Sequence, residues 1–174
     1  TELLETAPLP AEEPAWNDPA VKTSSFSWKD ADQDTALFKE PIPFVNRKGI
    51  DEELAGLTHN HHPDITWCPN GDLLAVWFST RSEIGREMQI VSSRLRKGAT
   101  GWEPLRRFFS APDRNNTGST LFCDEKGMLC FFGTISESSH HRDQLMFVIT
   151  SNDSGRTWSV PRVISSLDDR HKYT

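Results

Sequence analysis

Two stretches of the chain share one arrangement of apolar runs and turns, displaced along the sequence by a constant interval. Gly71 and Gly127 are 56 residues apart, and so are Trp102 and Trp158. Each stretch holds four short runs of β-type residues, separated by polar or glycine-bearing turns. A repeat of about 50 residues with four strands per unit is the pattern of a β-propeller blade. The repeat therefore predicts an all-β chain with two four-stranded blades.

The expected strands follow from the apolar runs. They cover residues 64–67, 73–80, 88–95 and 104–109 in the first repeat, and 119–123, 129–136, 144–151 and 160–165 in the second. The Asn70-Gly71 pair marks the first turn as a hairpin. We therefore expect blade one over about residues 59–110 and blade two over about 113–168, within a region spanning 51–174. Because a closed ring needs at least about four blades, we expect an incomplete propeller, completed by a longer chain or by other copies.

Residues 1–50 differ from the rest of the chain in their proline content. Prolines at positions 8, 10, 14 and 19 alternate with acidic residues, and Pro41 and Pro43 interrupt short apolar groups. Proline fixes φ and removes a backbone donor, which excludes it from helix interiors and central strands. This region is therefore expected to be an extended arm, with its apolar groups in edge strands or in packed extended segments.

Composition excludes several classes of protein. The net charge of −6 argues against nonspecific nucleic-acid binding, which needs a positive surface to attract phosphates. No apolar run approaches the roughly 20 residues of a membrane-spanning helix. The first residues show no secretion signal, and a chain already stripped of its signal would look the same. Cys68, Cys123 and Cys130 lack the CxxC spacing of a zinc site, so no disulfide framework, metal or cofactor is expected.

One short motif identifies the type of propeller. Residues Ser151 to Trp158 match S-x-D-x-G-x-T-W at every fixed position, including Asp153, Gly155 and Thr157. This motif suits a tight turn between the third and fourth strands of a blade. The carboxylate would accept backbone N–H bonds, the glycine would adopt positive φ, and the tryptophan would pack between blades. A longer, degraded version in the first repeat keeps Ser93, Gly98 and Trp102. We assign the motif a structural role.

The motif is the Asp-box, or BNR repeat, of sialidase-type propellers, and residues 59–165 resemble the opening blades of bacterial sialidase-like proteins. The resemblance implies a carbohydrate-active enzyme that acts on terminal sugars of glycans, usually as an exo-glycosidase. Some relatives with this fold are polysaccharide lyases. A glycan partner and a secreted or periplasmic location are the corresponding expectations. Because fold does not determine function, the loops must carry the argument.

Strands of a blade run up and down, so the loops sort onto two faces. One face is expected to hold the segment before the first strand, the loops between second and third strands, and the connection between blades. These segments contain His59 to His62, Arg81 to Glu87, Asp113 to Asn116, and His140 to Asp143. The other face carries turn-forming residues. We therefore expect the functional site on the face rich in histidine and arginine.

Such a cluster suits an acidic sugar, because arginine binds a carboxylate with two parallel hydrogen bonds. The residues proposed to bind substrate are Arg81, Arg86, Asp113, Arg114, Asn115 and Asn116. The catalytic candidates are His61 and His62, since histidine is the commonest general acid or base, and Glu83 or Glu87 as acid/base. A metal role for His59, His61 and His62 is an alternative, since residues i and i+2 share a strand face.

The resemblance also shows departures from sialidases. An Arg-Ile-Pro segment opens their first blade and supplies a carboxylate-binding arginine, whereas this chain has His61-His62-Pro63. Arg81 matches the second carboxylate-binding position, but the one tyrosine, Tyr173, lies far from where the family's nucleophile belongs. Three hypotheses about the function follow: an exo-acting glycoside hydrolase, a lyase on uronate-containing glycans with histidine as base, or a non-catalytic carbohydrate-binding propeller.

Overall fold

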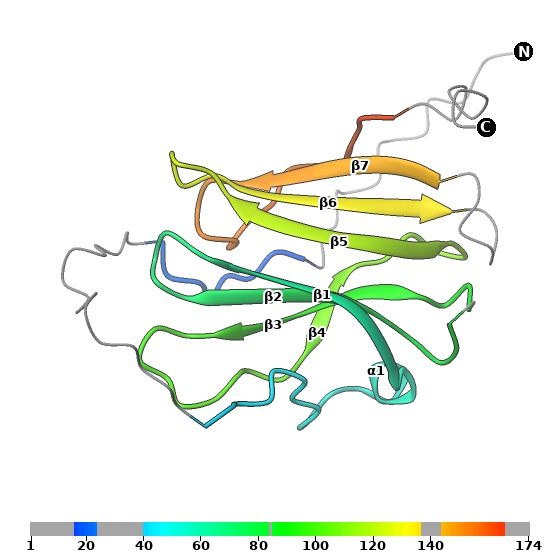
Figure 1. Cartoon of the computed structure of the whole chain (residues 1–174), viewed down its shortest axis with the longest axis horizontal. Coiled ribbons are helices and arrows are strands. Elements are labelled where there is room, and N and C mark those ends of the chain that lie inside the picture. Colours follow the sequence, from blue (N-terminus) through cyan, green and yellow to red (C-terminus); the bar gives the residue numbers. More distant parts are fainter. Residues whose placement is uncertain (1–15, 24–39, 84, 137–143, 166–174) are drawn as a thin grey trace, which may run out of the picture.

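The computed structural model describes residues 16–23, 40–83, 85–136 and 144–165 of the chain as two antiparallel four-stranded sheets, one above the other (Figure 1). The first sheet has the order β1-β2-β3-β4, and the second β5-β6-β7-β8. The strands are β1 (His59–Trp67), β2 (Leu73–Thr80), β3 (Gln89–Leu95), β4 (Arg106–Phe109), β5 (Asn115–Cys123), β6 (Leu129–Ser136), β7 (Gln144–Ser151) and β8 (Arg162–Val163). The predicted all-β fold with two four-stranded blades is confirmed.

The predicted interval of 56 residues is visible in the strand bounds themselves. It separates both ends of β1 from those of β5, and both ends of β2 from those of β6. Gly71 and Gly127 occupy equivalent hairpin turns with φ of +87° and +85°. At these two positions positive φ favours glycine, because a Cβ atom would be strained there.

The first strand of each blade begins earlier than the apolar pattern predicted. β1 continues past a bulge between His61 and Asp64, and β5 past one between Thr117 and Ser119. The bulged residues His62 and Gly118 both have positive φ, of 52° and 70°. A proline normally ends a strand, but Pro63 lies within this irregular stretch and is tolerated there. His59 to His62 therefore belong to β1 itself, and do not precede it as predicted.

Apolar side chains from both sheets meet in one core. Val76 and Phe78 of β2 share this cluster with Phe131 of β6 and Phe147 of β7. Val76 and Phe131 have no exposed surface. Residues on alternate positions of β2, such as Trp77, face the opposite way and belong to a second cluster. The first sheet is thus covered on both faces, which explains why nearly all of β2 is buried.

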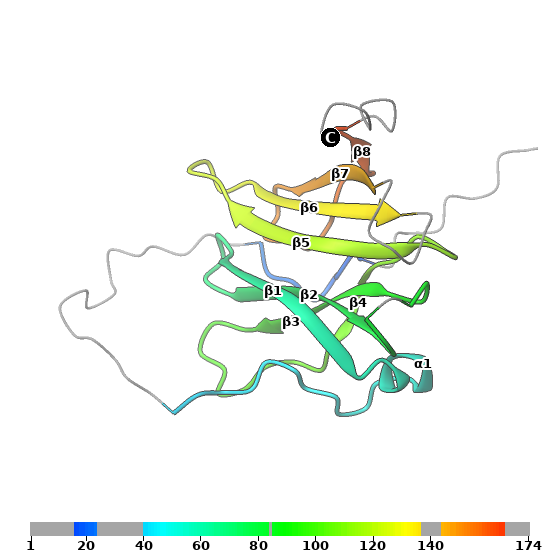
Figure 2. The ribbon, with the colours of Figure 1, turned by 45° about the vertical axis from the view of Figure 1, so that its right-hand side comes forward.

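A short helix, α1 (Glu52–Gly56), lies beside the first sheet at the end where β1 begins (Figure 2). Asp51 begins the helix by accepting the backbone N–H of Leu54 at 2.8 Å. Arg47 ends it by donating to three backbone carbonyls, including that of Leu57 at 2.8 Å. Leu54 and Leu57 then pack with Trp77. The helix is fastened at both ends by side chains, as a helix this short requires.

The Asp-box forms the turn that follows β7. Ser151 Oγ donates to Asp153 Oδ1 at 2.7 Å and accepts the N–H of Gly155 at 2.9 Å. Asp153 also accepts the backbone N–H of Thr157 at 2.9 Å and its hydroxyl at 2.6 Å. Gly155 has φ of +80°. Trp158, which is buried, packs edge-on against Phe108 of β4 with ring centroids 5.2 Å apart. The motif thus joins blade two to blade one.

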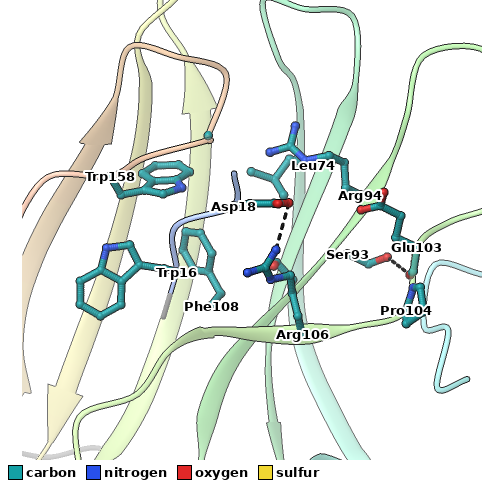
Figure 3. Close-up of a pocket in the computed structure, with 12 residues that line it drawn as sticks. Trp16, Asp18, Leu74, Ser93, Arg94, Glu103, Pro104, Arg106, Phe108 and Trp158 are labelled. Carbon is teal, nitrogen blue, oxygen red and sulfur yellow. Dashed lines mark hydrogen bonds and ion pairs between the residues drawn. The ribbon is translucent and has the colours of Figure 1, made fainter. Parts of the chain in front are cut away.

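A segment of the arm, residues 16–23, lies in the seam between the blades (Figures 1 and 3). Trp16 packs on Phe109 with ring centroids 5.6 Å apart. Asp18 accepts from Arg106 at 2.9 Å, and its backbone N–H donates to the carbonyl of Arg156 at 2.6 Å. Figure 3 shows Asp18 pointing toward Arg106, with Trp16 beside Trp158 and Phe108. Residues 16–23 and 40–50 contain no strand.

Candidate functional site

The loops divide between two ends of the blades. At one end the β1–β2 turn meets the Asp-box, because the backbone N–H of Asn70 donates to Ser154 Oγ at 3.2 Å. The starts of β1 and β5, the β2–β3 loop and the β4–β5 loop lie at the other end, which we call the histidine–arginine end. It contains the residues proposed from the sequence as catalytic or substrate-binding. His140 and His141 lie outside the described residues.

The histidines form a row of rings along β1. His59 stacks on His61 with ring centroids 4.5 Å apart, and His61 lies 6.0 Å from His62. The last two rings both pack against Phe78, each at 5.6 Å. The side chains of His61 and His62 are exposed, and the hydroxyl of Ser119 on β5 donates to the His62 carbonyl. Strand β1 therefore presents two imidazole rings to solvent.

Glu87 lies at the end of the β2–β3 loop, and its carboxylate accepts hydrogen bonds from the start of the loop. Its Oε1 accepts the backbone N–H of Arg81 and the hydroxyl of Thr80, both at 3.2 Å. Burial by itself would raise the pKa of Glu87, but hydrogen bonds from its own N–H, from Arg81 and from Thr80 lower it overall. A side chain at Gly85 would collide with this carboxylate. Glu87 is therefore ionised at neutral pH and holds the loop in shape.

Arg81 and Glu83 extend from the same loop and are exposed. The Arg81 side chain lies over the last residue of α1, since a Cβ atom on Gly56 would lie 3.7 Å from Arg81 Nε. The guanidinium is thus supported by the helix and remains open to solvent. Glu83 is the more accessible of the two glutamates of this loop.

The β4–β5 loop brings a second group of charges to this end. Asp113 has φ of 53° and lies 3.1 Å from Arg86 and 3.7 Å from Arg114. The Arg86–Asp113 pair is exposed, with 51% and 74% of the side chains accessible, so it contributes little to stability. Arg86, Glu87 and Asp113 line a hollow of about 440 Å³.

Asn115 and Asn116 lie at the start of β5 and are both buried. Asn116 Nδ2 donates to the carbonyls of Met88 at 2.8 Å and Arg114 at 2.9 Å, and Oδ1 accepts the N–H of Ala111 at 3.0 Å. These bonds give Asn116 a structural role in fastening the β4–β5 loop. Asn115 makes fewer contacts, with Nδ2 donating to the carbonyl of Gly85 at 3.4 Å.

Three residues beside the hollow were not singled out from the sequence. Arg107 pairs with Glu53 of α1 at 2.8 Å and donates to Gln89 at 2.7 Å. Gln89 in turn donates to Glu53 at 2.6 Å. The network depends on α1, for which the apolar pattern gave no signal. It joins the helix to β3 and β4 and forms one wall of the hollow.

Within the described residues, no group of three His, Cys, Asp or Glu side chains has the geometry to hold a metal ion. In that same part of the chain, no helix is both long and apolar enough to cross a membrane. A second hollow, of about 500 Å³, lies at the Asp-box end, where Lys22, Asn70 and Arg96 are among the residues lining it. The histidine–arginine end differs from it in presenting exposed imidazoles beside exposed arginines.

Two stacked four-stranded sheets, joined through an Asp-box, define a sialidase-type β-propeller domain. The family model of the BNR repeat-like domain matches residues 71–172, and the chain belongs to this family.

A solved sialidase structure shows the same fold. The Hadza microbial sialidase Hz136 matches with a TM-score of 0.52 and 20% identity, over 60% of this chain and 26% of its own. A protein of unknown function from Dyadobacter fermentans DSM 18053 matches with a TM-score of 0.49 and 15% identity, over 68% of this chain and 38% of its own. The chain thus spans less than half the length of either protein. No curated protein matches.

Proposed function

We propose that the protein is a carbohydrate-active enzyme that acts on terminal acidic sugars of glycans as an exo-acting glycoside hydrolase. The observation that carries the proposal is the gathering of exposed Arg81, His61, His62 and Glu83 at the end where β1 and β5 begin. Family membership supports the class of activity, and the arginines supply the means of binding a sugar carboxylate.

Within this proposal the two glutamates take different roles. A general acid must transfer its proton to the glycosidic oxygen, whereas the Glu87 carboxylate is already held in the loop by hydrogen bonds from Thr80 and Arg81, which lower its pKa. Glu83 is exposed and free to approach a glycosidic oxygen. We therefore assign proton donation to Glu83 and the positioning of the loop, including the Arg81 backbone, to Glu87.

A second candidate is a lyase on uronate-containing glycans. The exposed imidazoles of His61 and His62 favour it, since a neutral imidazole can remove the proton next to a uronate carboxylate while Arg81 neutralises that carboxylate. Elimination then breaks the C–O bond to the leaving sugar as a C=C double bond forms in the uronide, and the leaving oxygen takes up the proton from the imidazolium.

The products separate these reactions. The intact protein would be incubated with sialosides, rhamnosides and uronate polysaccharides, and released sugars measured together with near-ultraviolet absorbance. A hydrolase releases a saturated terminal sugar without new absorbance, whereas a lyase produces an absorbing uronide. Binding without turnover of any of them would contradict both enzymes and favour a carbohydrate-binding propeller.

We also propose that further blades cover the outer face of blade two, supplied by a longer chain or by other copies. Phe122 and Met146 on that face are 43% and 42% exposed, and Phe122 stacks on Phe132 at 6.0 Å. Large apolar groups of this kind mark a surface that another element covers. Light scattering on the 174-residue chain would show association of copies if they close the ring. Because glycans are displayed outside cells, we propose a secreted or periplasmic location, which cell fractionation would test.

A further inference from the structure

Two buried polar atoms at the histidine–arginine end have no hydrogen-bond partner. They are Nε2 of His59 and Oδ1 of Asn115, and among the described residues only Trp16 Nε1 and Arg96 Nη1, at the arm seam, share this condition. Leaving a buried polar atom unpaired is destabilising, so native proteins keep few such groups. At a candidate site, such atoms are positions where a hydroxyl group of a ligand can form a hydrogen bond.

The two residues are equivalent in the repeat. His59 is the first residue of β1 and Asn115 the first residue of β5, separated by the 56 residues that relate the blades. β1 and β5 lie side by side, since Asp64 on β1 accepts the N–H of Leu121 on β5 at 2.8 Å. Both unpaired atoms therefore belong to the first strands of adjacent blades, at the same end.

Both residues lie next to the β2–β3 loop, which carries Arg81 and Glu87. His59 lies opposite Thr80 in the β1–β2 register, and the Thr80 hydroxyl donates to Glu87. Asn115 has no exposed surface, and its amide contacts the β2–β3 loop only through a long bond of 3.4 Å to Gly85. Positive φ occurs at His62, three residues after His59, and at Asp113, two residues before Asn115. Strained backbone of this kind gathers at binding sites.

We propose that His59 and Asn115 form the polar floor of the sugar pocket and bond hydroxyl groups of the bound ring. An amide oxygen only accepts hydrogen bonds, so Asn115 Oδ1 selects a hydroxyl and disfavours a carboxylate, which goes to the arginines. Asn115 is covered in the free protein, so a bound sugar displaces the long contact of 3.4 Å between the Asn115 amide and the Gly85 carbonyl. This inference rests on the proposed function and deepens it, by assigning two residues that form hydrogen bonds with hydroxyl groups of the sugar ring.

Asn115→Leu tests the inference, because leucine has a similar shape without the polar atoms. We expect the variant to unfold in urea at the same or a higher concentration than the parent, since an unpaired buried oxygen is removed. Its affinity for a sugar the parent binds is expected to fall at least about tenfold. Affinity would be measured by calorimetry on the intact protein with N-acetylneuraminic acid, D-glucuronic acid and L-rhamnose.

Asn116→Leu is the matched control for stability. Its side chain makes the bonds to Met88, Arg114 and Ala111 described above, so this variant is expected to unfold at a clearly lower urea concentration. His59→Phe keeps the ring that stacks on His61 and removes both nitrogens. It is expected to fold and to bind the same sugar at least about tenfold more weakly.

Three results would overturn the inference. If Asn115→Leu loses as much stability as Asn116→Leu, Asn115 is structural. If the parent binds a sugar and both Asn115→Leu and His59→Phe bind it equally well, the residues do not read the ring, and the proposed function stands without them. If the parent binds none of the three sugars, the proposed function fails, and the inference fails with it.

Discussion

Arg94 of β3 donates from Nη2 to the backbone carbonyl of Ser154 at 3.0 Å and so joins the first blade to the Asp-box of the second. Its Nη1 lies 3.3 Å from the Asp72 carboxylate, and the two side chains are only 5% and 7% exposed. A buried charge this well paired is costly to break on one side, because the remaining partner keeps its charge without compensation. The Arg94–Ser154 contact joins the two blades in addition to their shared apolar core.

Replacing Arg94 by methionine should therefore be strongly destabilising. We expect a loss of about 3 kcal/mol in the free energy of unfolding, since Asp72 is left buried with Arg96 at 3.6 Å as the nearest cation. Urea denaturation measures the change. Arg86→Met is the control, because the exposed Arg86–Asp113 pair contributes at most about 1 kcal/mol. Similar losses in both variants would contradict the role given to Arg94.

The charge of Asp153 makes the stability that the Asp-box contributes depend on pH. Burial would raise the pKa of Asp153, but bonds from Thr157, Ser151 and the Arg156 N–H lower it overall. Its stabilising effect is therefore complete above the unfolded value of about 3.9 and is lost as pH falls through the lower folded value. Asp153→Asn should cost about 1 kcal/mol at neutral pH, and the difference from the parent should shrink below about pH 4. A difference that stays constant across this range would refute the assignment.

The regular part of the fold could be predicted from the sequence. Strand positions follow from the apolar runs, and the two glycines at positions 71 and 127 mark equivalent turns. The start of β1 could not be predicted, because proline is normally excluded from regular strands. Pro63 is accommodated in β1 by the bulge between His61 and Asp64. Helix α1 was also missed, since its five residues are too few to show a helical period.

The candidate site was predictable in its location and less so in its roles. Because consecutive strands of a blade run in opposite directions, the order of the loops was enough to predict Arg81, His61 and Asp113 at one end. The low pKa of Glu87 depends on the N–H of Arg81 and the hydroxyl of Thr80, which are contacts set by loop geometry. The pairing of Arg94 with Asp72 likewise depends on tertiary contacts that no local pattern reports.

The arm segment provides a third test. Asp18 accepts from Arg106 at 2.9 Å and from Arg96 at 3.3 Å, so Asp18→Asn removes the charge that holds residues 16–23 in the seam. In the parent, the backbone N–H of Asp18 donates to the Arg156 carbonyl at 2.6 Å. We expect this N–H to exchange its hydrogen with solvent faster in the variant, because the segment is held less firmly. Asp113→Asn, an exposed site elsewhere, should leave exchange in the segment unchanged. Equal exchange in parent and Asp18→Asn would show that apolar packing alone holds the segment.

Thiol reactivity tests the burial of Cys68 in the core shared by the two sheets. Burial raises the pKa of Cys68 to about 11, although Arg94 and its bond to the sulfur at 3.4 Å oppose the shift. Only a thiolate reacts readily with alkylating reagents, so Cys68 should be modified in the unfolded protein and resist in the folded one at mildly alkaline pH. Cys123, which is half-buried, serves as the internal comparison in a mass-spectrometric time course. Modification of Cys68 as fast as Cys123 would contradict the packing described.

The proposal of a glycan-processing site at the histidine–arginine end is tested most directly by comparing two exposed arginines at opposite ends of the blades, Arg81 and Arg156. The measurement is the rate at which the intact protein converts the sialoside or uronate polysaccharide on which it is active. Arg81→Ala should lower this rate at least about a hundredfold, the size of effect seen when a group that stabilises transition-state charge is removed. Arg156→Ala, in the Asp-box turn, should leave it unchanged. Equal rates in the two variants, or a larger loss with Arg156→Ala, would contradict the placement of the site.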